Sequence, residues 1–159
     1  MELPFDLDLN GKVAVVTGGA GVLCSTFAEA LAEAGADVAI LDINLEGAEE
    51  VANKINDAGG NALAVKTNIL EQDSLKEARE TVNDQLGSCD ILINGAGGNH
   101  PSGTTTKDYL EPEDLQEKKD EITTFFDLDA EGIQFVFNLN FLGALLTTQV
   151  FAKDMAEKE

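Results

Sequence analysis

Short apolar runs and longer amphipathic stretches alternate along the first 95 positions of the chain. Four apolar runs are bounded by Gly, Asn or Asp, at residues 13–16, 38–41, 62–65 and 91–93. Uninterrupted runs of this length are typical of strands that are buried on both faces of a parallel sheet. The pattern therefore predicts four parallel strands.

The stretches between the runs have the spacing of amphipathic helices. Residues 25–34 end at a glycine, and residues 46–58 end at a pair of glycines, as helices commonly do. Ser74 and Glu77 have the spacing of a capping box, which predicts a third helix from Ser74 to Gly87. The alternating order implies right-handed crossovers, so we predict an α/β fold with a Rossmann-like, doubly wound parallel sheet.

The pattern changes after the fourth run. Residues 98–134 have little apolar periodicity and are rich in acids, which predicts a long acidic insert within a single domain spanning 1–159. One short helix could form around Leu115, Ile122 and Phe125. Residues 141–155 predict a strong final helix. Its expected buried stripe consists of Leu142, Leu145, Leu146, Phe151 and Ala152.

Composition excludes several classes of protein. The formal net charge is −20, from 30 acidic against 10 basic residues, which argues against nucleic acid as a partner. We see no run of the roughly 20 apolar residues that a membrane helix needs, and no secretory signal at the N-terminus. Cys24 and Cys89 lack metal-ligand spacing, so we expect reduced thiols, no metal site and a cytoplasmic protein without a membrane partner.

A glycine-rich turn follows the first strand, with glycines at positions 18, 19 and 21. Such a turn lets the backbone approach a pyrophosphate at the N-terminus of the next helix. Asp42 ends the second strand, where a carboxylate can accept both ribose hydroxyls of an adenosine and repel a 2′-phosphate. The carboxylate of Asp42 therefore favours NAD over NADP. The alternative for Asp42 is a helix cap or turn residue.

Three motifs, in this order, resemble those of the short-chain dehydrogenases/reductases. Residues 17–24 are similar to the family's TGxxxG[IL]G turn, residues 94–97 to its NNAG motif, and residues 140–143 to the NxxG that opens its fifth helix. Residues 19–24, 93–101 and 125–129 also resemble the D-mannonate oxidoreductase (fructuronate reductase) branch. Members of that branch interconvert a keto-hexuronate and an aldonate with a nicotinamide cofactor. The resemblance thus implies an NAD-dependent oxidoreductase acting on a sugar acid.

The resemblance also implies roles for individual residues. Gly18 would make the tight turn, Asp42 would hold the adenosine ribose, and Asn68 would meet the adenine amino group. Asn140 matches the asparagine that holds a water in the family's proton relay, and is the implied catalytic residue. The residues assigned to cofactor binding are Gly18, Gly21, Val22, Leu23, Asp42, Asn68, Ile69, Asn94, Ala96 and Gly97.

Two departures from the family pattern change the expectation. Val22 and Cys24 occupy the positions of the second and third glycines of the turn. The family's serine and Tyr-x-x-x-Lys follow the fifth helix, whereas the single tyrosine here, Tyr109, has Glu113 four residues later. We therefore expect the N-terminal, cofactor-binding part of a longer homo-oligomeric enzyme, about four strands long and inactive by itself. The alternative is a catalytically inactive nucleotide-binding or dimerisation module.

Three weaker signals remain. His100 is either a solvated loop histidine or a contact to substrate. Residues 127–132 imitate the start of an EF-hand loop, but Asn138 stands where the loop needs a bidentate glutamate, which disfavours calcium. A Ser-His-Asp hydrolase is disfavoured because the sequence has no nucleophile elbow.

Overall fold

Four parallel strands form one sheet in the order β3-β2-β1-β4. The computed structural model describes residues 7–115 and 122–158. The strands are β1 (Val13–Thr17), β2 (Asp37–Asp42), β3 (Asn61–Lys66) and β4 (Ile91–Asn94). Each predicted apolar run lies within one of these strands, and the predicted α/β, Rossmann-like class is confirmed.

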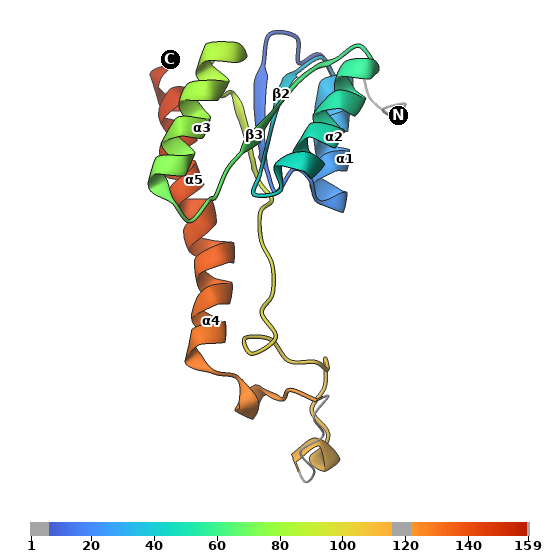
Figure 1. Ribbon diagram of the computed structural model, residues 1–159, viewed down its shortest axis with the longest axis vertical. Helices are drawn as coiled ribbons and strands as arrows, with labels where there is room; N and C mark the ends of the chain where they lie inside the picture. The colour runs from blue at the N-terminus through green and yellow to red at the C-terminus, as the bar shows by residue number, and fades with distance from the viewer. Residues whose placement is uncertain (1–6, 116–121, 159) are drawn as a thin grey trace.

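Helices cover both faces of the sheet (Figure 1). One face packs against α1 (Val22–Glu33) and α2 (Leu45–Asp57), and the other packs against α3 (Gln72–Gln85) and α5 (Gly143–Glu157). Residues along each strand alternate between the two cores: Val16 and Ile40 pack toward α1 and α2, while Val15 and Leu41 pack toward α3 and α5. All four are fully buried. The strands are continuously apolar because neither face meets water.

The predicted capping box of the third helix is wrong. Helix α3 begins at Gln72, with Glu71 in the capping position and no side-chain cap. Ser74 lies inside the first turn, where its Oγ accepts a hydrogen bond from the backbone N–H of Asn68 at 2.9 Å. The hydroxyl therefore stabilises the turn between β3 and α3 instead of the start of the helix.

The final helix is longer than the periodicity predicts. Helix α4 (Ala130–Phe137) continues through a π-helical turn at Asn138–Leu142 into α5, so the helix begins at Ala130 and overlaps the predicted end of the insert. Asp129 caps it, because its Oδ1 accepts the N–H of Gly132 at 2.6 Å. The expected buried stripe is partly wrong: Phe151 is fully buried, whereas Leu142 and Leu145 are 38% and 44% exposed.

The segment from Ala130 to Glu157 is long and apolar enough, by length and composition alone, to cross a membrane. The expectation that no segment meets this description is therefore wrong. Core helices of soluble proteins can be equally long and apolar, and α5 packs on the sheet through Thr147 and Phe151. Only 17% of the most apolar 18-residue stretch of this segment is buried, however, so most of its apolar surface is uncovered.

The segment between β4 and α4 extends away from the sheet beside α4 (Figure 1). It contains two short 3₁₀ turns, Pro112–Leu115 and Phe125–Asp127, in place of the one predicted helix; residues 116–121 of the predicted insert lie outside the described residues. Two carboxylates of the EF-hand-like stretch cap helical turns, Asp127 at Thr124 and Asp129 at Gly132. Within residues 7–115 and 122–158, no cluster of His, Cys, Asp or Glu is arranged to hold a metal ion.

One buried ion pair ties α3 to α5. Nε of Arg79 donates to Oδ1 of Asp154 at 2.8 Å, and the Asp154 side chain is only 2% exposed. The hydrogen bond that the Arg79 guanidinium donates to Asp154 raises the pKa of Arg79. The second carboxylate oxygen, Oδ2, is buried without a hydrogen-bond partner, so the neutralisation of Asp154 depends on Arg79.

Candidate functional site

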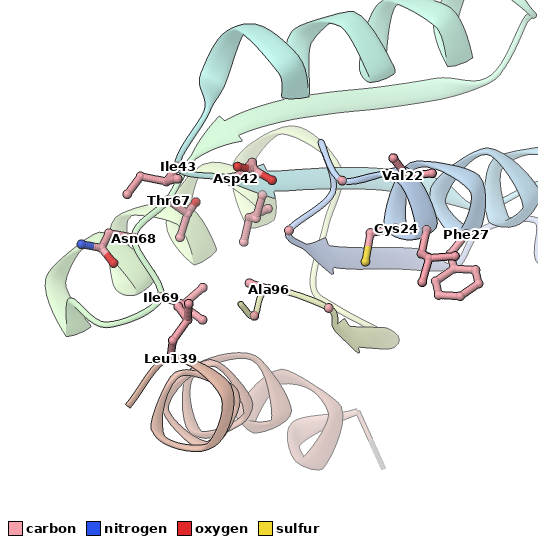
Figure 2. A pocket seen from close by; sticks show the side chains of 16 residues that line it. Val22, Cys24, Phe27, Asp42, Ile43, Thr67, Asn68, Ile69, Ala96 and Leu139 are labelled. Carbon is pink, nitrogen blue, oxygen red and sulfur yellow. The ribbon is translucent and has the colours of Figure 1, made fainter. Parts of the chain in front are cut away.

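A cavity of about 630 Å³ opens at the carboxyl ends of the strands (Figure 2). Its walls come from the turn between β1 and α1, the ends of β2 and β3, the loop after β4, and Leu139 of the final helix. The carboxyl edge of a doubly wound parallel sheet is where such folds bind ligands. The predicted cofactor residues that line it are Gly18, Gly21, Val22, Leu23, Asp42, Asn68, Ile69, Ala96 and Gly97.

The glycine turn leaves room for an anion at the start of α1. Gly18 has φ +65°, and a Cβ there would lie 2.8 Å from both the Cα and the N of Ala96. The N–H of Gly21 bonds to the Gly18 carbonyl at 2.9 Å, and Gly21 precedes α1 without any side-chain cap. The first N–H groups of the 12-residue helix are therefore free to meet a phosphate. This arrangement fits the pyrophosphate of a dinucleotide.

Thr17 is a site residue whose role the sequence did not reveal. Its side chain is buried, and its Oγ1 accepts the N–H groups of Gly95 at 3.1 Å and Ala96 at 3.2 Å. These bonds fasten the loop after β4 to the end of β1. The partners are far apart in sequence, so no local pattern could have indicated them.

Asp42 forms two turn hydrogen bonds and also lines the cavity, while its binding to a ribose stays a prediction. Its Oδ2 accepts the N–H of Ala20 at 3.1 Å and its Oδ1 accepts the N–H of Asn44 at 2.9 Å, so the carboxylate does stabilise turns. Asn44 is the residue that caps α2, through the N–H of Gly47. The Asp42 side chain also lines the cavity, and each carboxylate oxygen keeps a lone pair for a ribose hydroxyl.

At the adenine end of the predicted site, the polar side-chain atoms of Asn68 already have hydrogen-bond partners within the protein. Oδ1 of Asn68 already accepts the N–H of Leu70 at 3.1 Å, and its Nδ2 donates to Glu71 at 2.8 Å. An adenine amino group would therefore share Oδ1 with Leu70. Ile69 is 6% exposed and belongs mainly to the core. Ile43, which the sequence analysis did not select, also lines the cavity and is 66% exposed.

Asn94 and Asn140 do not line the cavity. Nδ2 of Asn94 donates to Oγ1 of Thr148 in α5 at 2.9 Å. Asn140 lies in the π-helical turn and holds the backbone of Gly98 from both sides, accepting its N–H at 3.1 Å and donating to its carbonyl at 2.7 Å. The side chain of Asn140 thus clamps the loop after β4 to the final helix. Its role in a proton relay stays a prediction.

His100 is held by the protein on two sides. Its Nδ1 lies 3.0 Å from Oγ of Ser102, and its ring centroid is 5.1 Å from that of Phe135 in α4. The N–H of Gly132 and the hydroxyl of Ser102 lower the pKa of Asp129, the cap of α4. His100 therefore belongs to a polar junction between the insert and α4. A contact to substrate stays a hypothesis.

Val22 and Cys24 have different surroundings. Val22 is 86% exposed, and its side chain lines the cavity. Cys24 is 7% exposed, and burial, with a contribution from the charge of Asp42, raises the pKa of its thiol. Its thiol is therefore neutral at pH 7 and packs as a small apolar group.

Comparisons with known proteins show which family the sequence matches and which relatives it has. Residues 12–159 match the family model described as short chain dehydrogenase. An uncharacterized oxidoreductase of Haemophilus influenzae is 51% identical over 159 residues, which are all of this chain and 54% of that protein. An uncharacterized oxidoreductase of Bacillus subtilis, UxuB, is 43% identical over 157 residues, or 99% of this chain and 54% of that protein.

Solved structures similar to this chain are also those of oxidoreductases. A Haemophilus influenzae protein provisionally assigned as a D-mannonate oxidoreductase, with bound NAD, superposes with a TM-score of 0.85 at 51% identity, covering 94% of this chain and 52% of that one. Hydroxysteroid dehydrogenase from Escherichia coli has a TM-score of 0.77 at 28% identity, covering 96% and 55%. The chain spans about half the length of the relatives it matches.

Proposed function

The chain belongs to the short-chain dehydrogenase family, and from that premise we propose that it is the NAD-binding part of an oxidoreductase that acts on a sugar acid. The observation that carries the proposal is the cavity at the turn between β1 and α1, where the predicted cofactor residues meet. The nicotinamide supplies the hydride acceptor or donor when it is bound. The protein supplies binding, orientation and exclusion of water.

In this proposal, each wall of the cavity binds a different part of the dinucleotide. The N–H groups at the start of α1 bind the pyrophosphate, which matters in a chain with a formal net charge of −20. Asp42 accepts the adenosine ribose hydroxyls. Ala96 and Gly97, held by Thr17 and by the neighbouring clamp on Gly98, line the central ribose.

The Tyr-x-x-x-Lys pattern that the family uses for proton transfer does not occur among these 159 residues. Tyr109 is 84% exposed in the insert, and Glu113, not a lysine, stands four residues later. A tyrosine acts as a general acid only when a neighbouring charge brings its pKa toward the working pH. We therefore propose that catalysis uses residues of a longer protein, and that this chain alone turns over no sugar acid. An inactive nucleotide-binding module is the alternative, and the intact mass of the natural protein distinguishes the two.

The substrate class is proposed from similarity. The neighbour at 51% identity carries a provisional D-mannonate oxidoreductase assignment, and that protein contains NAD. A hexuronate or aldonate is consequently the first substrate to test on the full-length protein. NADP is disfavoured because a 2′-phosphate would approach the carboxylate of Asp42.

Replacing Asp42 with alanine tests the cofactor assignment. The wild-type chain is expected to bind NAD more tightly than NADP, and Asp42→Ala is expected to weaken NAD by about tenfold while changing NADP less, because one pair of ribose hydrogen bonds is lost and one repulsion disappears. Calorimetric titration with both cofactors measures this. Asp37→Ala, at the opposite end of β2, is the control and keeps both affinities. Equal losses for NAD and NADP would show that Asp42 does not reach the ribose.

We further propose that two copies associate through the uncovered face of the final helix. Exposed apolar residues lie along this helix: Ile133, Phe137, Phe141, Leu142 and Leu145, and Phe135, whose ring also contacts His100. Exposed apolar side chains gathered along one helix are a mark of an interaction site. A lipid bilayer is the competing partner, given the length and apolarity of the segment.

A single charge on that face is expected to separate the copies. Phe141 is 67% exposed, and Phe141→Asp should convert a dimer to a monomer because it would place a carboxylate in an apolar interface. Sedimentation velocity measures the mass in solution. Phe125→Asp is the matched control, because Phe125 is 70% exposed and lies in the insert, outside the final helix. A wild-type monomer that binds vesicles would contradict the dimer and favour the membrane.

A further inference from the structure

Cys24 and Gly95 meet at the wall of the cofactor cavity, although one lies in the first turn of α1 and the other follows β4. Figure 2 shows the thiol of Cys24 pointing from α1 toward the loop that carries Ala96. A Cβ built on Gly95 would overlap Sγ of Cys24 and would lie 2.9 Å from the carbonyl oxygen of Thr17. The thiol therefore occupies the volume in which a side chain at position 95 would begin.

Both positions depart from the family motifs. The turn has Cys24 where the pattern TGxxxG[IL]G has its last glycine, and the NNAG motif has Gly95 in place of its second asparagine. Either change alone would be unfavourable: a side chain at 24 would press on one at 95, and a glycine at 95 facing a glycine at 24 would leave a void. Together, the two changes move the side chain at this contact from position 95, where the family motif has an asparagine, to position 24.

We propose that Cys24 and Gly95 form a matched pair that sets the separation between α1 and the loop after β4, which makes Cys24 a positioning residue for the cofactor site. The loop is fastened from beneath by Thr17, whose Oγ1 accepts the N–H groups of Gly95 and Ala96. The thiol contacts it from the side of α1. Ala96 and Gly97 line the cavity directly beyond this contact, so a shift of the loop moves the cavity wall.

A double-mutant cycle tests the pair through thermal stability. Gly95→Ala is expected to lower the melting temperature by roughly 5–10 °C, because its Cβ overlaps the thiol. In the Cys24→Gly background the same Gly95→Ala change should cost less than half as much. If Gly95→Ala alone yields no folded protein, recovery of folded protein by Cys24→Gly is the supporting result. An equal cost in both backgrounds, or no recovery, overturns the proposal.

Cys89 gives a matched control. It is the second buried cysteine, it lies in the core beside α3 and α5, and burial raises the pKa of its thiol to about 12. Cys89→Ala should not relieve Gly95→Ala. Relief by Cys89→Ala as large as that by Cys24→Gly would show general loosening of the fold and would overturn the pairing.

A binding measurement separates positioning from packing; this part rests on the proposed function. Cys24→Gly is expected to weaken NAD by about three- to tenfold, whereas Cys24→Ser, which keeps a side chain of similar size, should stay within about twofold of wild type. Equal NAD affinity for wild type and Cys24→Gly would overturn the positioning role. If the wild-type chain binds no NAD, the proposed function fails, while the melting-temperature cycle still decides whether the two residues are matched.

Discussion

Arg79→Met is expected to reduce the free energy of unfolding by about 3–5 kcal/mol, because it leaves a buried carboxylate without its counter-charge. Asp154 is 2% exposed, and its second oxygen has no hydrogen-bond partner to compensate. The loss would also loosen the contact between α3 and α5. Urea unfolding followed by circular dichroism measures the change.

Two further variants serve as controls for Arg79→Met. Lys76→Met removes an exposed ion pair with Asp73 on the same helix, and it should cost less than about 1 kcal/mol. Arg79→Met combined with Asp154→Leu should recover much of the loss, because no unpaired charge remains in the core. A loss in Arg79→Met no larger than that in Lys76→Met would mean that the pair contributes little to the fold.

Gly18→Ala is expected to weaken NAD binding by about 10- to 100-fold and to destabilise the chain. A positive φ costs an alanine about 1–2 kcal/mol. Its Cβ would also lie 2.8 Å from backbone atoms of Ala96, which cannot rotate away as a side chain can. The collision would displace the same loop that lines the cavity. Calorimetric titration with NAD and thermal unfolding measure the two effects.

Gly11→Ala separates the backbone cost from the collision. Gly11 has φ +74°, close to that of Gly18, but a Cβ there would meet no atom within 4 Å. Its stability should fall by about 1–2 kcal/mol while NAD affinity is unchanged. If Gly18→Ala behaved like Gly11→Ala in both measurements, the packing of the turn on Ala96 would be irrelevant to binding.

The strands were predictable from the sequence because burial on both faces leaves uninterrupted apolar runs, as in Val13 to Val16. The start of the final helix was not, because Ile133 and Phe135 directly follow an acid-rich stretch that hides their periodicity. The cap at Asp129 becomes visible only in the structure. Local patterns thus identified the elements more reliably than their ends.

In the candidate site, too, residues with a local sequence signature could be predicted and residues that depend on long-range contacts could not. Gly18 and Asp42 could be selected because each has a local signature, a glycine turn and an acid at the end of a strand. Thr17 could not, since its partner Gly95 is 78 residues away. The clamp of Asn140 on Gly98 and the contact of Cys24 with Gly95 are likewise long-range. A single sequence contains no signal for such contacts.

The apolar stretch of the final helix has a consequence for how this protein meets others. Residues 133–152 contain no ionisable side chain, whereas the whole chain carries a formal charge of −20. Two molecules that approach through most other surfaces bring like charges together and repel each other over about 10 Å at moderate ionic strength. If two copies associate through this helix as proposed, its uncharged surface is the part of the molecule where approach meets the least repulsion, so the distribution of charge favours that orientation before any side chain makes contact.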